Sequence, residues 1–273
     1  MNRKLKRLEE NLKKMGSVLI AFSGGVDSTF LLKVSSDVLG DKVMAVTSSS
    51  PIHFSYELKE ARKIARRLEV RHIISNSREC ENEDLIRNTV NRCYFCKKKL
   101  FKELKRIAKK NGLRFVLDGS NYDDLRSFRP GKRALKELGI RSPLAKVELR
   151  KEEIRKLSKK IGLPTWNRPS QTCLATRIPY GERMTRKRLE RIEKGEEFLK
   201  GLGLKEVRLR DHKDMARIEV NPKEIKILVK EDVRKKVIDG LKRLGYTYIS
   251  LDLEGYRSGS MDKSFKTVNK SIS

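Results

Sequence analysis

The chain has 273 residues, of which 37% are hydrophobic and 37% are charged, and its formal net charge is +29 at pH 7. This composition excludes a disordered chain and is typical of a highly charged globular protein that is long enough for two domains. The sequence has no apolar run that could span a membrane, and residues 1–16 predict an amphipathic helix without an apolar signal region, so we expect a cytoplasmic protein with no membrane partner.

The strands and helices predicted for residues 17–120 alternate. Residues 17–39 predict a strand, a glycine turn and a helix, and the segments that follow predict, in turn, strand 42–50, helix 55–70, strand 71–75, helix 93–112 and strand 113–120. Continuous apolar strands between amphipathic helices favour a doubly wound α/β fold, in which both faces of a parallel sheet are covered. Because ligands bind at the carboxyl ends of such strands, we expect SGGVDS, TSSS and DGSN to face one crevice.

The second half of the chain changes in character. Residues 141–166 predict a short strand and a helix, followed by the loop that carries Cys173 and a hinge at 179–181. Beyond it, a long helix, two strands, helices over 222–244 and a last strand predict a smaller α+β domain. We therefore expect a nucleotide-binding domain with the cysteine site over residues 1–181 and a domain for substrate binding or oligomerisation over residues 182–273.

The motif SGGVDST, residues 23–29, is the strongest single signal. Its glycines allow a tight turn, so that backbone N–H groups and the positive end of the next helix converge on an anion. It lacks the lysine of the G-x-x-x-x-G-K-[ST] loop and the third glycine of the dinucleotide fingerprint. It resembles the pyrophosphate loop (PP loop) of ATP pyrophosphatases, and an ordinary glycine-rich turn is the alternative. By this resemblance Asp27 holds Mg²⁺ or orders the loop.

The residues that we expect to bind ATP come from three strand ends. They are Ser23, Gly24, Gly25, Asp27, Ser28 and Thr29 after the first strand, Ser48 in the second, and Asp118 and Gly119 after the fourth.

Four cysteines would be too few for a disulfide framework in a chain of this length, so we treat them as thiols. Cys93 and Cys96 lie three positions apart at the start of a predicted helix, where the helix dipole favours thiolates. Three interpretations stay open. The pair could form a zinc site with Cys80 and Cys173, hold a [4Fe–4S] cluster together with Cys173 alone, or consist of unrelated buried thiols.

A series of segments in chain order resembles the LarE family of ATP-dependent sulfur-insertion enzymes, over nearly the whole chain. They are SGGVDST, NRCYFCKKKLF, LDGSNYDDLRSFRPGKRAL, IRSPL, IGLPTWNRPSQTCLATRIPYGE, VRLRDHKDMARIEV and LDLEGYRSGSM. The resemblance implies that ATP adenylates the carboxylates of pyridinium-3,5-biscarboxylic acid mononucleotide and that sulfur then displaces AMP, during biosynthesis of the nickel-pincer nucleotide. It also implies a fold like that of the adenine nucleotide alpha-hydrolases and a homo-oligomer.

The family resemblance implies two routes for the sulfur. In one, Cys173 is the catalytic residue that gives up its own sulfur. In the other, which the presence of all three cysteines favours, Cys93, Cys96 and Cys173 hold a [4Fe–4S] cluster that delivers sulfide. Arg177, Arg208 and Arg210 are expected at the substrate phosphate or carboxylates, and Cys80 is interpreted as a loop thiol.

The net charge keeps one other enzyme class open. A strongly basic protein attracts RNA, and a tRNA thiolase with a PP loop is the alternative enzyme. The sequence shows no RNA-binding module that supports it. Solvated helix faces such as KKKLFKELKRIAKK account for much of the same charge. An ATP-sensing scaffold with a zinc site is the alternative that is not an enzyme.

Overall fold

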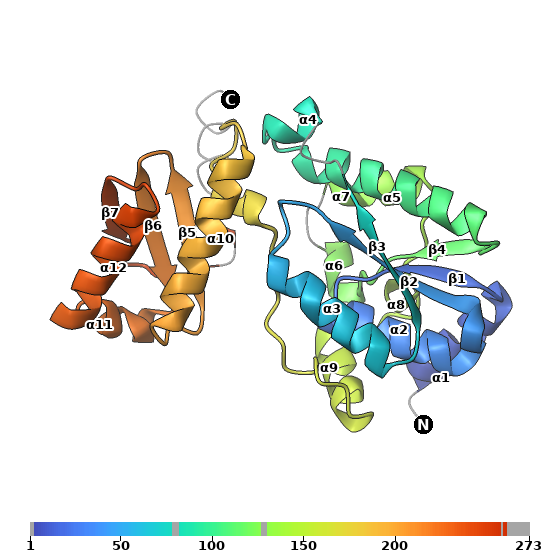
Figure 1. Ribbon diagram of the computed structural model, residues 1–273. Helices are drawn as coiled ribbons and strands as arrows, with labels where there is room; N and C mark the ends of the chain where they lie inside the picture. The colour runs from blue at the N-terminus through green and yellow to red at the C-terminus, as the bar shows by residue number, and fades with distance from the viewer. Residues whose placement is uncertain (1–2, 78–81, 127–129, 258, 261–273) are drawn as a thin grey trace. The chain divides into compact units, whose positions relative to one another are not determined.

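The computed structural model describes residues 3–77, 82–126, 130–257 and 259–260. The chain divides into two compact units (Figure 1), Met1–Leu85 with Asn91–Gln171, and Ile86–Val90 with Thr172–Ser273. Cys80 lies outside the described residues, so its interpretation as a loop thiol stays a prediction. Within the described residues no helix is long and apolar enough to cross a membrane.

A four-stranded parallel sheet in the order β3-β2-β1-β4 forms the centre of the first unit. Its strands are β1 (Val18–Ala21), β2 (Val43–Ser49), β3 (Arg71–Asn76) and β4 (Phe115–Leu117). The chain runs from β1 outward to β3 and then returns to place β4 on the other side of β1. This reversal of strand order marks the ligand-binding edge of a doubly wound sheet.

Helices cover both faces of this sheet, and the predicted doubly wound α/β fold is confirmed. One layer consists of α1 (Arg3–Met15), α2 (Val26–Leu39), α3 (Ser55–Arg67) and α9 (Lys151–Lys160), and the other of α5 (Arg92–Lys110) and α7 (Gly131–Glu137). Val18 and Ile20 of β1 pack with the first layer, whereas Leu19 packs with the second. Because side chains alternate along a strand, a sheet buried on both faces needs the continuous apolar run found here.

The prediction of a short strand within residues 141–166 is wrong. Pro143–Lys146 form the short helix α8 instead. Just before it, Arg141 forms an isolated β-bridge with Leu117. Proline has no N–H to give to a sheet but fits the first turn of a helix, which explains the difference. The predicted helix that follows is α9. Further short elements here are η1 (Gly40–Lys42), α4 (Glu83–Ile86) and α6 (Tyr122–Arg126).

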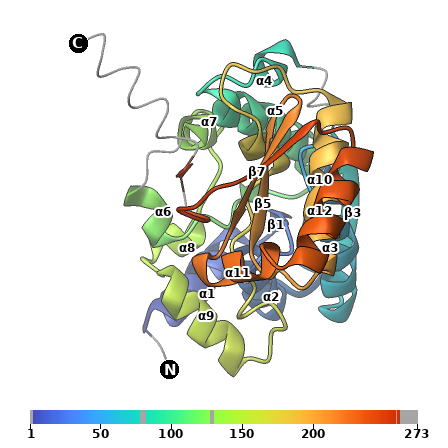
Figure 2. The same ribbon diagram turned by 90° about the vertical axis from the view of Figure 1, so that its left-hand side faces the viewer.

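The second unit contains a three-stranded mixed sheet with helices packed on it, as expected for a small α+β fold. Its elements are η3 (Leu174–Arg177), α10 (Arg186–Gly201), β5 (Val207–His212), β6 (Met215–Val220), η4 (Pro222–Glu224), α11 (Ile225–Leu228), α12 (Glu231–Arg243) and β7 (Tyr248–Leu251). Strand β6 is antiparallel to β5 and parallel to β7. Helices α10 and α12 pack side by side against this sheet (Figures 1 and 2) and bury Leu199, Val237 and Leu241.

Candidate functional site

The turn between β1 and α2 is built for an anion. Gly24 has a φ of +70°, and a Cβ at this position would lie 3.3 Å from Ala61 Cα, so both backbone conformation and space require glycine. Gly25 precedes α2 and provides no side-chain cap. The first N–H groups of α2 therefore lack both an intrahelical acceptor and a capping side chain, which makes them available to a phosphate.

Serine hydroxyls hold the PP loop in shape. Ser23 Oγ and Ser28 Oγ lie 3.1 Å apart, and the Gly25 N–H donates to Ser23 Oγ over 3.3 Å. Ser28 Oγ in turn donates to the Gly25 carbonyl oxygen over 3.2 Å. Thr29 is fully buried, and its hydroxyl has no hydrogen-bond partner among the described residues. The serines line the turn, whereas Thr29 lies beneath it.

Asp27 points from the first turn of α2 to Lys151, which begins α9 and donates to its Oδ2 atom. The Oδ1 atom is buried, and a hydrogen bond from the side chain of Asn121 to this carboxylate lowers the pKa of Asp27. Burial raises the pKa of Asp27 above its usual value, even though Lys151 attracts its negative charge; Asp124 adds to the rise. A carboxylate such as that of Asp27 is the type of ligand that suits Mg²⁺. Sequence reasoning missed Lys151.

The segment after β4 lies against the PP loop. A Cβ on Gly119 would be 3.2 Å from the backbone nitrogen of Ser28, a tight contact that glycine avoids. Asp118 is buried, and its carboxylate lies 3.7 Å from Lys97 Nζ. Lys97 follows Cys96 on α5, so the strand end and the cysteine helix meet at this point. The predicted DGSN segment therefore lies beside SGGVDS.

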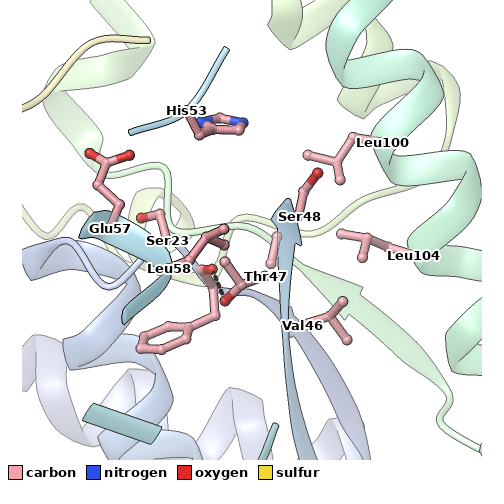
Figure 3. A pocket seen from close by; sticks show the side chains of 11 residues that line it. Ser23, Val46, Thr47, Ser48, His53, Glu57, Leu58, Leu100 and Leu104 are labelled. Carbon is pink, nitrogen blue, oxygen red and sulfur yellow. Dashed lines mark hydrogen bonds between the residues drawn. The ribbon is translucent and has the colours of Figure 1, made fainter. Parts of the chain in front are cut away.

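A pocket of about 110 Å³ lies at the carboxyl ends of β1 and β2 (Figure 3). Its lining residues are Ala21, Phe22, Ser23, Val46, Thr47, Ser48, His53, Glu57, Leu58, Leu100 and Leu104. Leu100 and Leu104 of α5 face it from the side opposite Glu57 (Figure 3). The pocket brings together Ser23 and Ser48, two residues predicted to bind ATP. A mainly apolar lining with a few polar groups suits a flat heteroaromatic ring.

Cys93 and Cys96 lie at the start of α5. The side chain of Cys93 is exposed, and that of Cys96 is partly buried. Their spacing puts them on neighbouring turns of one helix face at its positive end, so the pair fits two thiolate ligands of a metal or cluster. Within the part of the chain that the structure describes, no group of three or more His, Cys, Asp or Glu side chains is placed to hold a metal ion.

Cys173 belongs to the second unit and directly precedes η3. Its carbonyl oxygen accepts hydrogen bonds from Thr176 Oγ1 at 2.8 Å and from Arg177 Nη1 at 3.2 Å. Arg177 is fully buried, donates to Thr172 and forms an ion pair with the equally buried Glu196 at 2.8 Å. The guanidinium of Arg177 is therefore engaged with the protein and anchors the turn that carries Cys173.

Arg208 and Arg210 are both buried on β5 but have different surroundings. Arg210 forms an ion pair with Glu219 at 2.6 Å and donates to the Thr176 carbonyl oxygen at 2.9 Å. Arg208 stacks on Tyr256, with its guanidinium carbon 4.6 Å from the ring centre. Its Nη1 donates to the Val207 carbonyl oxygen at 2.9 Å, whereas its Nε has no hydrogen-bond partner among the described residues. A buried guanidinium whose hydrogen-bonding groups are only partly used suits an anionic ligand.

No family model matches the sequence. The chain is 37% identical over 254 residues to pyridinium-3,5-bisthiocarboxylic acid mononucleotide synthase of Lactiplantibacillus plantarum, an alignment that covers 92% of this chain and 91% of that protein. The chain belongs to the LarE family. This LarE-family protein is also 41% identical over 260 residues to an uncharacterised protein of Synechocystis sp., covering 95% and 97% of the two chains. A relative in Methanocaldococcus jannaschii, likewise uncharacterised, is 33% identical over 261 residues.

Proposed function

We propose that this LarE-family protein is an ATP-dependent sulfur transferase that converts the carboxylates of pyridinium-3,5-biscarboxylic acid mononucleotide into thiocarboxylates, a step in making the nickel-pincer nucleotide. The observation that carries the proposal is the similarity over 92% of the chain to a synthase of the corresponding bisthiocarboxylate. The PP loop at the reversal of strand order supports the ATP-dependent part of the reaction.

ATP makes the carboxylate reactive. A carboxylate oxygen attacks the α-phosphorus of ATP, and pyrophosphate leaves with the electrons of the broken P–O bond. The acyl carbon of the resulting mixed anhydride then accepts a sulfur nucleophile, and AMP leaves. We assign the phosphates to the N–H groups and serines of the PP loop, Mg²⁺ to Asp27, and adenine to the pocket beside Ser23 and Ser48.

Cys93, Cys96 and Cys173 are the proposed ligands of a [4Fe–4S] cluster, which when bound would supply the sulfur for transfer. The thiols of Cys93 and Cys96, on one face at the start of α5, fit two of these ligands. In the alternative route Cys173 gives up its own sulfur. In either route we assign the buried Arg208 to the phosphate or a carboxylate of the substrate, because its Nε–H has no hydrogen-bond partner among the described residues.

The mass of the intact protein after turnover decides between the routes. We expect an unchanged mass with repeated turnover, and about four irons per chain after anaerobic reconstitution. Cys173→Ala should lose iron and sulfur transfer but keep ATP binding. Loss of the elements of H₂S from Cys173 would overturn the cluster route. Thiolation of tRNA without any reaction of the pyridinium nucleotide would overturn the proposed substrate.

A further inference from the structure

The peptide between Gly24 and Gly25 is held by a side chain from a distant part of the sequence. Arg168 Nη1 donates to the Gly24 carbonyl oxygen over 2.9 Å, and its Nη2 donates to Glu60 of α3 over 3.0 Å. Arg168 follows α9 and lies 144 residues after Gly24. Of the two contacts, the first reaches the backbone of the PP loop itself.

Holding this carbonyl also sets the direction of the Gly25 N–H. In a planar trans peptide the C=O and N–H bonds point in opposite directions. A peptide between two glycines turns over easily, because neither residue has a Cβ that restricts its backbone. If it turned over, the Gly24 carbonyl oxygen would replace the N–H inside the loop and would repel a phosphate. In the structure the Gly25 N–H donates to Ser23 Oγ of the same loop over 3.3 Å.

A second arginine fixes the backbone from which Arg168 extends. Arg155 of α9 donates from Nη1 to the Trp166 carbonyl oxygen over 2.8 Å and from Nη2 to the Arg168 carbonyl oxygen over 2.7 Å. The Arg168 N–H also donates to the Thr165 carbonyl oxygen over 3.0 Å. The backbone of residues 166–168 is thus fixed to α9, and the Arg168 side chain reaches the loop from a fixed point.

We propose that Arg168 is a positioning residue of the PP loop. It locks the Gly24–Gly25 peptide with its N–H toward the nucleotide phosphates and in this way sets the affinity for ATP. The inference rests on the proposed use of ATP. Arg168 acts through the protein backbone, so its loss should weaken binding of the nucleotide phosphates. Binding of the base, which we assign to the pocket beside Ser48, should not change.

The test compares equilibrium binding of Mg–ATP and of adenosine to the full chain. We expect Arg168→Gln to weaken Mg–ATP binding about tenfold, because a charge-assisted hydrogen bond is lost. Adenosine should bind as it does to the wild type, since it has no phosphate. Arg168→Lys keeps one cationic donor and should recover part of the affinity for Mg–ATP.

Two control variants separate this role from general effects of charge or stability. Glu60→Gln removes the ion pair of Arg168 but leaves the Gly24 contact, and Arg106→Gln removes an exposed guanidinium of α5. Both should bind Mg–ATP like the wild type. The inference is overturned if Arg168→Gln binds Mg–ATP normally, if it loses adenosine equally, or if Glu60→Gln matches its defect. A wild-type chain that binds neither ligand would instead overturn the proposed function.

Discussion

Lys151, the first residue of α9, donates a hydrogen bond to the carboxylate of Asp27 in the first turn of α2. The pair joins two residues that are 124 positions apart in the sequence. Burial raises the pKa of Asp27 and the charge of Lys151 lowers it, with burial the larger influence. The protonation of the proposed Mg²⁺ ligand therefore depends on this lysine.

Acidification should weaken Mg–ATP binding at a higher pH than an ordinary aspartate would cause. Mg²⁺ binds the ionised carboxylate, and a raised pKa means that Asp27 takes up its proton at higher pH. Lys151→Met removes an attraction that lowers this pKa, so the loss of affinity should move to still higher pH. Measuring the affinity for Mg–ATP as a function of pH checks this. Asp27→Asn, which has no carboxyl group to protonate at this position, is the control. An unchanged or lower midpoint for Lys151→Met contradicts the prediction.

Asp27→Asn should reduce the rate of pyrophosphate release by about 100-fold, because a neutral amide holds a cation poorly while charge develops on the phosphates. The measurement is single-turnover release of pyrophosphate at saturating ATP. Asp37→Asn is the matched control, since Asp37 lies on the same helix, is exposed and pairs with Lys33. Equal rates for the two variants would remove Asp27 from the reaction.

The ion pair of Arg177 and Glu196 should contribute strongly to the stability of the second unit. Both side chains are fully buried, so Arg177→Met leaves an uncompensated carboxylate and should lower the free energy of unfolding by about 3–5 kcal/mol. Urea unfolding measures this. Lys235→Met breaks an exposed pair with Glu231 on α12 and should cost less than about 1 kcal/mol. Similar costs for the two variants would show that the buried pair is not structural.

Glycines on neighbouring helices of the second unit should respond oppositely to a methyl group. A Cβ at Gly240 of α12 would lie 2.3 Å from the ring of Phe198, so Gly240→Ala should destabilise the protein by about 1–3 kcal/mol. Gly201 of α10 has no atom within 4 Å of its would-be Cβ. Gly201→Ala should stabilise the helix by up to about 1 kcal/mol. Thermal unfolding of both variants distinguishes the outcomes, and equal effects would contradict the packing described.

Local patterns were enough to predict the glycine turn that follows β1 and the parallel sheet. The continuous apolar run of β1 indicates a strand buried on both faces, and the glycines of SGGVDST indicate the turn that follows. Each pattern can be recognised from residues that are neighbours in the sequence. The exception is Pro143–Lys146, where an expected strand proved to be a helix. There the pattern was too short to distinguish the two, and proline fitted the helix.

The contacts that give the site its chemistry were decided only by the tertiary structure. Lys151 meets Asp27 because α9 packs against α2, and Arg168 meets Gly24 because Arg155 fixes the segment after α9. Neither pair shares a local motif, since a contact across more than a hundred residues leaves no periodic trace in the sequence. The sequence by itself thus determined which residues could bind a phosphate. Packing determined which cationic side chains contact them, because Lys151 and Arg168 reach the loop only through the tertiary fold.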